Sequence, residues 1–448
     1  MTTRQLISAA TVACACALMA DGVPEAGNVS LTQDPFSREV TITYTLANAP
    51  AVVTLDIQTN GPNGWVSIGG EHIDCFSEES DVWKKVSGKE TYTIKWNPDQ
   101  SWPSNKVTMA DGGVKAVVTA WALDDTPDYM VVDITSAAEP NSQRYYPSVD
   151  FLPGGLFGKD DYRTIKLVMR KIHAKNVRWT MGSVLESSRS ANEATHDVTL
   201  TNNYYIGVFE VTQTQFYQVA GFNNSAYKID GAMRPANSVS FNALRCASVN
   251  SATYVGSGLP TDAPYTGSFL DILNRRTGLD FDLPGEAQWE YACRAGHGEM
   301  RWGDGSYISD ATDAGIPGRC QYTGGKVWNG SEYIIPSGST TGPTNGTAIV
   351  GSYAPNSWGL YDMHGNQYEY CLDWYEADIS SLNGAINIDP VNPLNTRAGQ
   401  VAGSKRVRRG GAYHTVATAC RPAARIDFDP KGADGTWGFR LVCRAGLK

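Results

Sequence analysis

The sequence has little charge and few histidines for its length. Of 448 residues only 19% are charged, 37 Lys and Arg stand against 46 Asp and Glu, and the net charge is −9 with 6 histidines. This acidic balance excludes a surface that holds nucleic acid by neutralising phosphates. At 42% apolar residues, the chain is too apolar for a disordered protein. Beyond the N-terminus no apolar run approaches the about 20 residues of a membrane span. We therefore expect no nucleic-acid partner and no transmembrane segment.

Residues 1–20 have the pattern of a secretory signal peptide. Arg4 precedes an apolar stretch from Leu6 to Ala20, and a polar break begins at Asp21. One positive charge, a short apolar core and small residues before a polar break are typical of such peptides. A buried first helix or strand is the alternative. The pattern favours an exported protein, whether periplasmic, cell-surface or secreted, and in an oxidising compartment some of its cysteines could pair.

Residues 28–135 alternate between apolar and polar positions, which is the period of half-buried strands. Val40, Ile42 and Tyr44 show the alternation first. Similar short runs occupy 53–57, 92–96, 114–121 and 129–134. Short strands at this spacing predict an immunoglobulin-like β-sandwich. It would lack the central disulfide of many such domains, because Cys75 is the only cysteine in the region.

A Pro-, Gly- and Ser-rich segment at 136–163 is expected to be a linker to a second body at 164–448. This second body has few helix signals. Thr212 and Gln215 form a capping box before a helix for which Gly221 is a terminator. Two more helices are expected at 269–277 and after Pro284. The fold class is therefore α+β and β-rich, with short helices and long loops.

Eight motifs follow one another in this second body. They are Met181–Ser183, Tyr205–Gln213, Arg234–Phe241, Leu283–Gly296, Trp302–Asp304, Asn356–Asn366 with Asp373–Tyr375, Arg409–Tyr413 with Cys420–Arg421, and Gly438–Arg440. In this order they resemble the formylglycine-generating enzyme, or sulfatase-modifying factor, family. The resemblance implies a C-type-lectin-like fold for residues 164–448.

The resemblance also places a copper-binding cysteine pair after the double glycine. The first cysteine of the family's oxidases lies four residues past it, and the second lies five residues further on. Here these positions hold Thr415 and Cys420. Copper(I) prefers soft thiolates, and a threonine hydroxyl is a hard ligand. An alternative alignment makes Cys420 a structural cysteine that forms a disulfide with Cys293, which leaves no active thiol.

Other groove and metal residues come from the same resemblance. His414 and Arg425 join Thr415 and Cys420 as candidates for the groove. A calcium loop would use the Asp362 side chain, backbone carbonyls and the Glu369 carboxylate, since hard oxygen donors suit Ca²⁺. The carbonyls belong to Met363, Gly365 and Gln367.

The incomplete cysteine pair favours a non-catalytic binding or scaffold protein with a protein or peptide ligand, or a glycan. The alternative is a formylglycine-generating oxidase that converts a sulfatase cysteine to formylglycine with O₂ and copper. Cys420 would then be the surviving catalytic thiol.

Overall fold

The computed structural model describes residues 22–446 with gaps. The gaps are 75, 78, 103–104, 106–111, 187–188, 227–230, 251–262, 309–326, 329–332, 335–345, 380–385, 389–404, 414 and 416. The expected signal peptide at 1–20 lies outside the described residues. Within the described part, no helix is long and apolar enough to cross a membrane.

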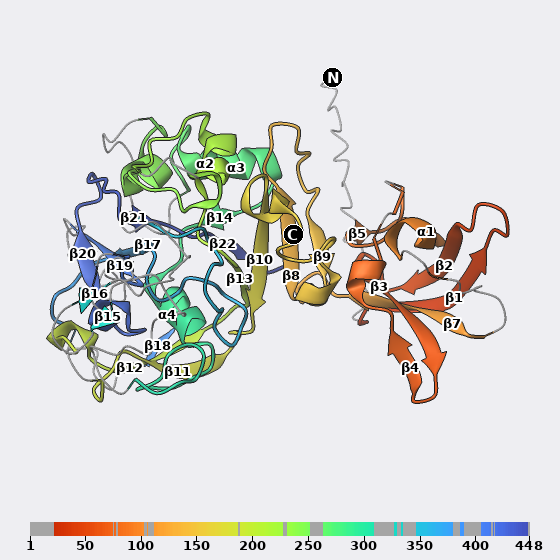
Figure 1. Cartoon of the computed structure of the whole chain (residues 1–448), viewed down its shortest axis with the longest axis horizontal. Coiled ribbons are helices and arrows are strands. Elements are labelled where there is room, and N and C mark those ends of the chain that lie inside the picture. Colours follow the sequence, from red (N-terminus) through yellow and green to blue (C-terminus); the bar gives the residue numbers. More distant parts are fainter. Residues whose placement is uncertain are drawn as a thin grey trace, which may run out of the picture.

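Two β-sheets form the N-terminal body (Figure 1). One sheet has the order β1 (Glu25–Gln33), β2 (Val40–Ala47), β6 (Tyr92–Trp96). In the other, β3 (Ala51–Gly61) pairs with β4 (Gly64–Ser67), β5 (Lys85–Val86) and β7 (Val114–Trp121). Buried side chains of β2, β3 and β6 share one apolar cluster, as their alternation predicts. A four-residue helix, α1 (Pro98–Ser101), follows β6.

A six-stranded sheet joins the two bodies. Its order is β14 (Phe281–Asp282), β22 (Val442–Arg444), β13 (Tyr204–Gly207), β10 (Lys166–Ile172), β8 (Tyr129–Asp133) and β9 (Arg144–Tyr146). We expected β8 in the sandwich, but it pairs with β10 of the C-terminal body. The reason is that both faces of β8 are buried: Met130 packs in one core cluster and Val131 in the other.

The segment expected to be a linker is packed rather than extended. It contains β9 and two 3₁₀ helices at Val149–Phe151 and Asp160–Arg163. Leu152 and Tyr162 are buried in the same cluster as the sandwich core. The Tyr145 amide donates a hydrogen bond of 2.8 Å to the Trp83 carbonyl. The sandwich and the C-terminal body therefore share a core as well as a backbone contact.

Short sheets and helices complete the C-terminal body. A four-stranded sheet has the order β20 (Ile426–Phe428), β19 (Arg406–Arg409), β17 (Tyr368–Trp374), β21 (Trp437–Gly438). A three-stranded sheet contains β11 (Val177–Met181), β12 (His196–Leu200) and β18 (Ile386–Ile388), and a two-stranded one contains β15 (Val327–Trp328) and β16 (Tyr333–Ile334). The helices are α2 (Gln213–Ala220), α3 (Phe269–Thr277) and α4 (Glu286–Arg294).

The sequence signals for these helices are confirmed. Thr212 caps α2 and forms the expected capping box with Gln215, and Gly221 ends the helix in the left-handed conformation with φ of 79°. Gly278 ends α3 in the same way. The core of the body lies between these helices and the six-stranded sheet.

Candidate functional site

The segment that follows the double glycine folds back on itself. Gly410 and Gly411 have φ of 89° and 75°, and a Cβ on Gly411 would lie 2.5 Å from Cys420 Sγ. Only glycine therefore allows this close approach. The Thr415 hydroxyl accepts from the Ala412 amide at 2.9 Å and donates to the Ala412 carbonyl at 2.8 Å. These contacts bring Thr415 Oγ1 to 3.8 Å from Cys420 Sγ.

Thr415 and Cys420, which the ungapped alignment assigns to the positions of the oxidase cysteine pair, thus lie next to each other in space. Cys420 is fully buried against Trp302, Ile308 and Ala417. One sulfur and one hydroxyl oxygen form the pair in this chain. Throughout the described residues, no group of three or more His, Cys, Asp or Glu side chains is arranged to hold a metal ion.

The structure does not contain the expected Cys293–Cys420 disulfide: both cysteines are thiols. The imidazole of His364 contacts both residues. It lies 3.7 Å from Cys293 Sγ, and its Nδ1 is 2.9 Å from the Cys420 carbonyl oxygen. Burial raises the pKa of the Cys293 thiol well above its ordinary value. Cys293 is therefore a protonated thiol in the apolar core.

His364 links Cys420 to Gly303 through its two ring nitrogens. The Gly303 amide donates to Nε2 at 3.1 Å, so Nδ1 carries the proton that bonds to the Cys420 carbonyl. The ring also packs edge-on against Trp302 at 5.2 Å between centroids. Sequence reasoning gave His364 no specific role. The sequence feature that could have identified it is its position within the Asn356–Asn366 motif.

Of the remaining groove candidates, His414 lies outside the described residues. Arg425 is already paired inside the protein: its guanidinium is buried and donates to Glu286 at 2.6 and 2.8 Å. The same side chain donates to the carbonyls of Asn192 and Glu376. Arg425 therefore holds the segment in place from inside the protein.

Arg425 belongs to a buried cluster that contains four glutamates and four arginines. We call it the ion cluster; its members are Glu186, Glu193, Glu286, Glu290, Arg294, Arg409, Arg421 and Arg425. It joins α4, the 186–193 loop and the 409–425 segment, and its charges balance. A buried charge is tolerated only when it is paired and hydrogen-bonded, so the cluster fixes the position of the Thr415–Cys420 segment.

Glu286 accepts hydrogen bonds from two arginines of the ion cluster, Arg409 and Arg425. Burial alone would raise its pKa, but the charges and hydrogen bonds of Arg425 and Arg409 outweigh burial and lower the pKa to about 2. Arg409 also donates to Glu290 at 2.7 Å. For Glu290 too, the arginine charges and the Gly182 amide overcome burial and lower the pKa.

The predicted calcium loop fits only in part. Both oxygens of Glu369 are engaged, since Arg440 donates to each at 2.6 Å and the Trp289 indole donates at 2.7 Å. Glu369 is therefore not the expected ligand: an internal guanidinium already neutralises it. Asp362 fits better, because its Oδ1 is buried with no hydrogen-bond partner among the described atoms. Burial raises the pKa of Asp362 to about 6, and the Glu369 charge adds to the rise.

Two of the expected carbonyl ligands also converge. The oxygens of Met363 and Gln367 lie 3.6 and 3.7 Å from the point that a Cβ on Gly410 would occupy, while Gly365 donates its amide to the Gly410 carbonyl. Of the predicted ligands, Glu369 is paired with Arg440, whereas Asp362 Oδ1 has no hydrogen-bond partner among the described atoms. The full predicted set of five ligands does not fit.

Comparison with known proteins agrees with the motif order. Residues 151–445 match the Sulfatase-modifying factor enzyme 1-like domain. The formylglycine-generating enzyme of Thermomonospora curvata is 35% identical over 181 residues, which cover 39% of this chain and 53% of that protein. The serine/threonine-protein kinase pkn1 of Chlamydia pneumoniae is 32% identical over 160 residues, 36% of this chain and 20% of the kinase. This chain spans about half the length of the formylglycine-generating enzymes that it matches first.

Among solved structures, Treponema denticola variable protein 1 is 23% identical with a TM-score of 0.44, over 62% of this chain and 96% of that chain. The family match covers more than half of the present sequence. The chain belongs to the family of Sulfatase-modifying factor enzyme 1-like domains.

Proposed function

We propose that this chain is an exported, non-catalytic binding or scaffold member of its family, with a protein or peptide ligand. One observation carries the proposal: Thr415 Oγ1 stands 3.8 Å from Cys420 Sγ where the oxidases place a second sulfur. Copper(I) is held by soft thiolates, and a hydroxyl does not replace one. The complete burial of Cys420 supports the same conclusion, since a reactive cysteine needs partial exposure.

The N-terminal body supports a binding role. It packs on the C-terminal body through the Trp83–Tyr145 backbone contact and a shared apolar core. The β-sandwich adds surface that a macromolecular ligand can contact. Export is proposed from the signal-peptide pattern of residues 1–20 alone.

Restoring the missing sulfur tests the proposal. We expect the wild-type protein to leave copper(I) on a competing chromogenic chelator and to form no aldehyde on a cysteine-containing sulfatase peptide under O₂. Thr415→Cys should gain one equivalent of copper(I), because the new sulfur would lie next to Cys420. Thr418→Cys adds a thiol in the same segment and is the matched control that should not gain a site.

Two outcomes would overturn the proposal. One is aldehyde formation by the wild-type protein, which would establish the oxidase alternative. The other is stoichiometric copper(I) binding by the wild-type protein that Cys420→Ala abolishes.

A further inference from the structure

Arg408 is a partly exposed arginine without an anionic partner. It lies on β19, where the other three residues are buried. Among the described residues, nothing forms a hydrogen bond or an ion pair with its guanidinium, and its Nε is buried. The two other arginines of β19 are engaged: Arg406 donates to the Leu372 carbonyl, and Arg409 belongs to the ion cluster. Arg408 therefore differs from its neighbours in having donors to spare.

Two aromatic rings hold the Arg408 side chain in place. Its Cζ lies 4.3 Å from the ring centroid of Tyr368 on β17 and 4.5 Å from that of Trp437 on β21. These two residues pair across adjacent strands, so the arginine side chain extends across the sheet. Cation–π contacts of this kind use the flat face of the guanidinium, whereas its N–H donors point outward from its edge. The guanidinium is thus oriented for a ligand that binds in its plane.

The carboxylates that act on Arg408 within the chain are engaged elsewhere. Asp427 forms an ion pair with Lys405, and Asp434 accepts from the Thr436 amide at 2.8 Å. Burial lowers the pKa of Arg408, and the charges of the two aspartates offset this shift only in part. A carboxylate in direct contact would compensate a charge that the described part of the chain leaves without an ion pair.

Tyr368 connects Arg408 to the Thr415–Cys420 segment. Burial raises the pKa of the Tyr368 hydroxyl, and both the Arg408 charge and a hydrogen bond with the Thr415 side chain oppose the rise. One tyrosine side chain therefore contacts both residues. Arg408 and Thr415 are each partly exposed, so a ligand on the Thr415–Cys420 segment lies within reach of the arginine.

We propose that Arg408 binds an acidic side chain, aspartate or glutamate, of the peptide ligand. This inference rests on the proposed function, because it names the chemistry by which that ligand is recognised. A carboxylate matches the edge of a guanidinium, since its two oxygens accept from two parallel N–H groups in one plane. Among the side chains of a peptide, only aspartate and glutamate carry this group.

Selection from a displayed library of random peptides tests the proposal, with the full chain immobilised. The peptides are fused through their C-termini, so side chains carry their only carboxylates. We expect binders of the wild-type protein to contain Asp or Glu at one preferred position. Changing that acid to its amide should weaken binding to the wild type by about tenfold or more, as for a charge-assisted hydrogen bond. On Arg408→Gln, the same change should alter binding by less than about twofold.

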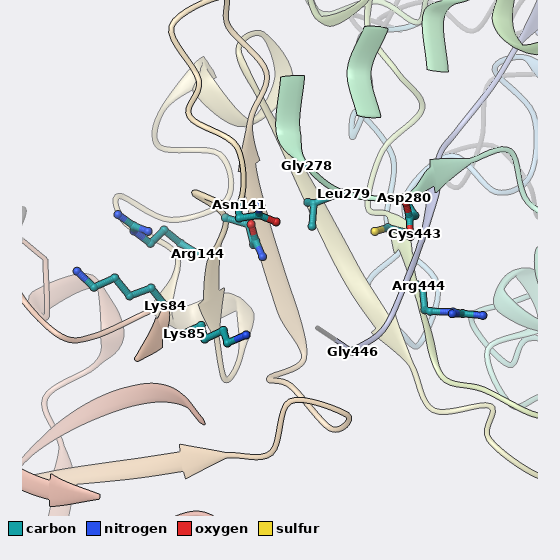
Figure 2. A pocket seen from close by; sticks show the side chains of 11 residues that line it. Lys84, Lys85, Asn141, Arg144, Gly278, Leu279, Asp280, Cys443, Arg444 and Gly446 are labelled. Atoms are coloured by element: carbon teal, nitrogen blue, oxygen red, sulfur yellow. The ribbon is translucent and has the colours of Figure 1, made fainter. Parts of the chain in front are cut away.

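Lys85→Gln is the matched control, because it also removes one positive charge. Lys85 extends into a pocket of about 450 Å³ between the sandwich and the C-terminal body, and Arg408 does not line this pocket (Figure 2). In Figure 1, β5 with Lys85 and β19 with Arg408 lie well apart. The control should therefore retain the full effect of the acid-to-amide change.

Arg408→Lys is a second variant, for the case that Arg408→Gln does not fold. Lysine keeps the charge but not the planar pair of donors, so the acid-to-amide change should have a smaller effect than on the wild type. Thermal unfolding midpoints of all variants are measured in parallel. The proposal is overturned if the binders show no preference for an acid, or if the effect of the acid is equal on the wild type and both Arg408 variants. If no peptide binds the wild-type protein, the proposed function itself is overturned.

Discussion

Replacing Glu286 by glutamine tests whether the ion cluster stabilises the fold around the Thr415–Cys420 segment. Glutamine preserves the shape of the side chain but removes the charge that Arg409 and Arg425 share at 2.6–2.8 Å. The pKa of Glu286 falls from 4.5 to about 2 in the folded protein. At about 1.4 kcal/mol per pKa unit, this corresponds to about 3 kcal/mol of stability at neutral pH. That value agrees with the roughly 3–5 kcal/mol lost when one partner of a buried ion pair is removed.

The pH dependence of the stability difference between wild type and Glu286→Gln follows from the direction of the pKa shift of Glu286. Because the pKa of Glu286 is lower in the folded than in the unfolded state, its contribution is complete above the unfolded value of 4.5 and disappears as the pH falls through about 2. The difference between wild type and Glu286→Gln should therefore be about 3 kcal/mol at pH 7 and roughly half that at pH 3.

Urea unfolding followed by tryptophan fluorescence at pH 7, 5 and 3 measures this difference. Glu139→Gln removes an exposed carboxylate and serves as the control, with an expected change within about 0.5 kcal/mol. The reasoning is refuted if Glu286→Gln is as stable as Glu139→Gln at pH 7. It is also refuted if the difference from wild type stays constant between pH 7 and pH 3.

Three further predictions concern the core, the thiols and the calcium loop. Trp83→Ala should lower the free energy of unfolding by about 3–5 kcal/mol, because Trp83 packs on Tyr146 at 5.1 Å between ring centroids. Calorimetry should show two unfolding transitions in the variant and one in the wild type. An unchanged single transition in the variant would contradict this prediction. Denatured without reductant, the protein should be alkylated at both Cys293 and Cys420, which are not disulfide-bonded; recovery of a linked peptide pair would show the opposite. Millimolar Ca²⁺ should raise the thermal unfolding midpoint of the wild type by a few degrees but not that of Asp362→Asn, because Asp362 Oδ1 has no hydrogen-bond partner in the described part of the chain. Equal shifts in the two proteins would exclude Asp362 as a ligand.

Local signals predicted local structure well. The Thr212–Gln215 capping box defines α2, and the alternation at Val40–Tyr44 defines β2, because each pattern acts within a few residues.

Long-range polar pairing was not predictable from the sequence. Glu286 and Arg425 lie 139 residues apart in the sequence. A glutamate or an arginine considered alone is expected at the protein surface. For the same reason the Arg440–Glu369 pair was missed, and Glu369 was assigned to calcium instead. The strand β8 was placed in the wrong sheet, since a strand buried on both faces gives no signal for which neighbour it pairs with.

The boundary recognised by family comparison differs from the boundary of the folding unit. The family match begins at residue 151, yet β8 and β9 precede it and form one side of the six-stranded sheet. A fragment that starts at 151 would leave β10 with a row of unpaired backbone amides and carbonyls, which invites aggregation. Soluble expression of the C-terminal body therefore requires the chain to begin before β8, even when only the Thr415–Cys420 segment is of interest.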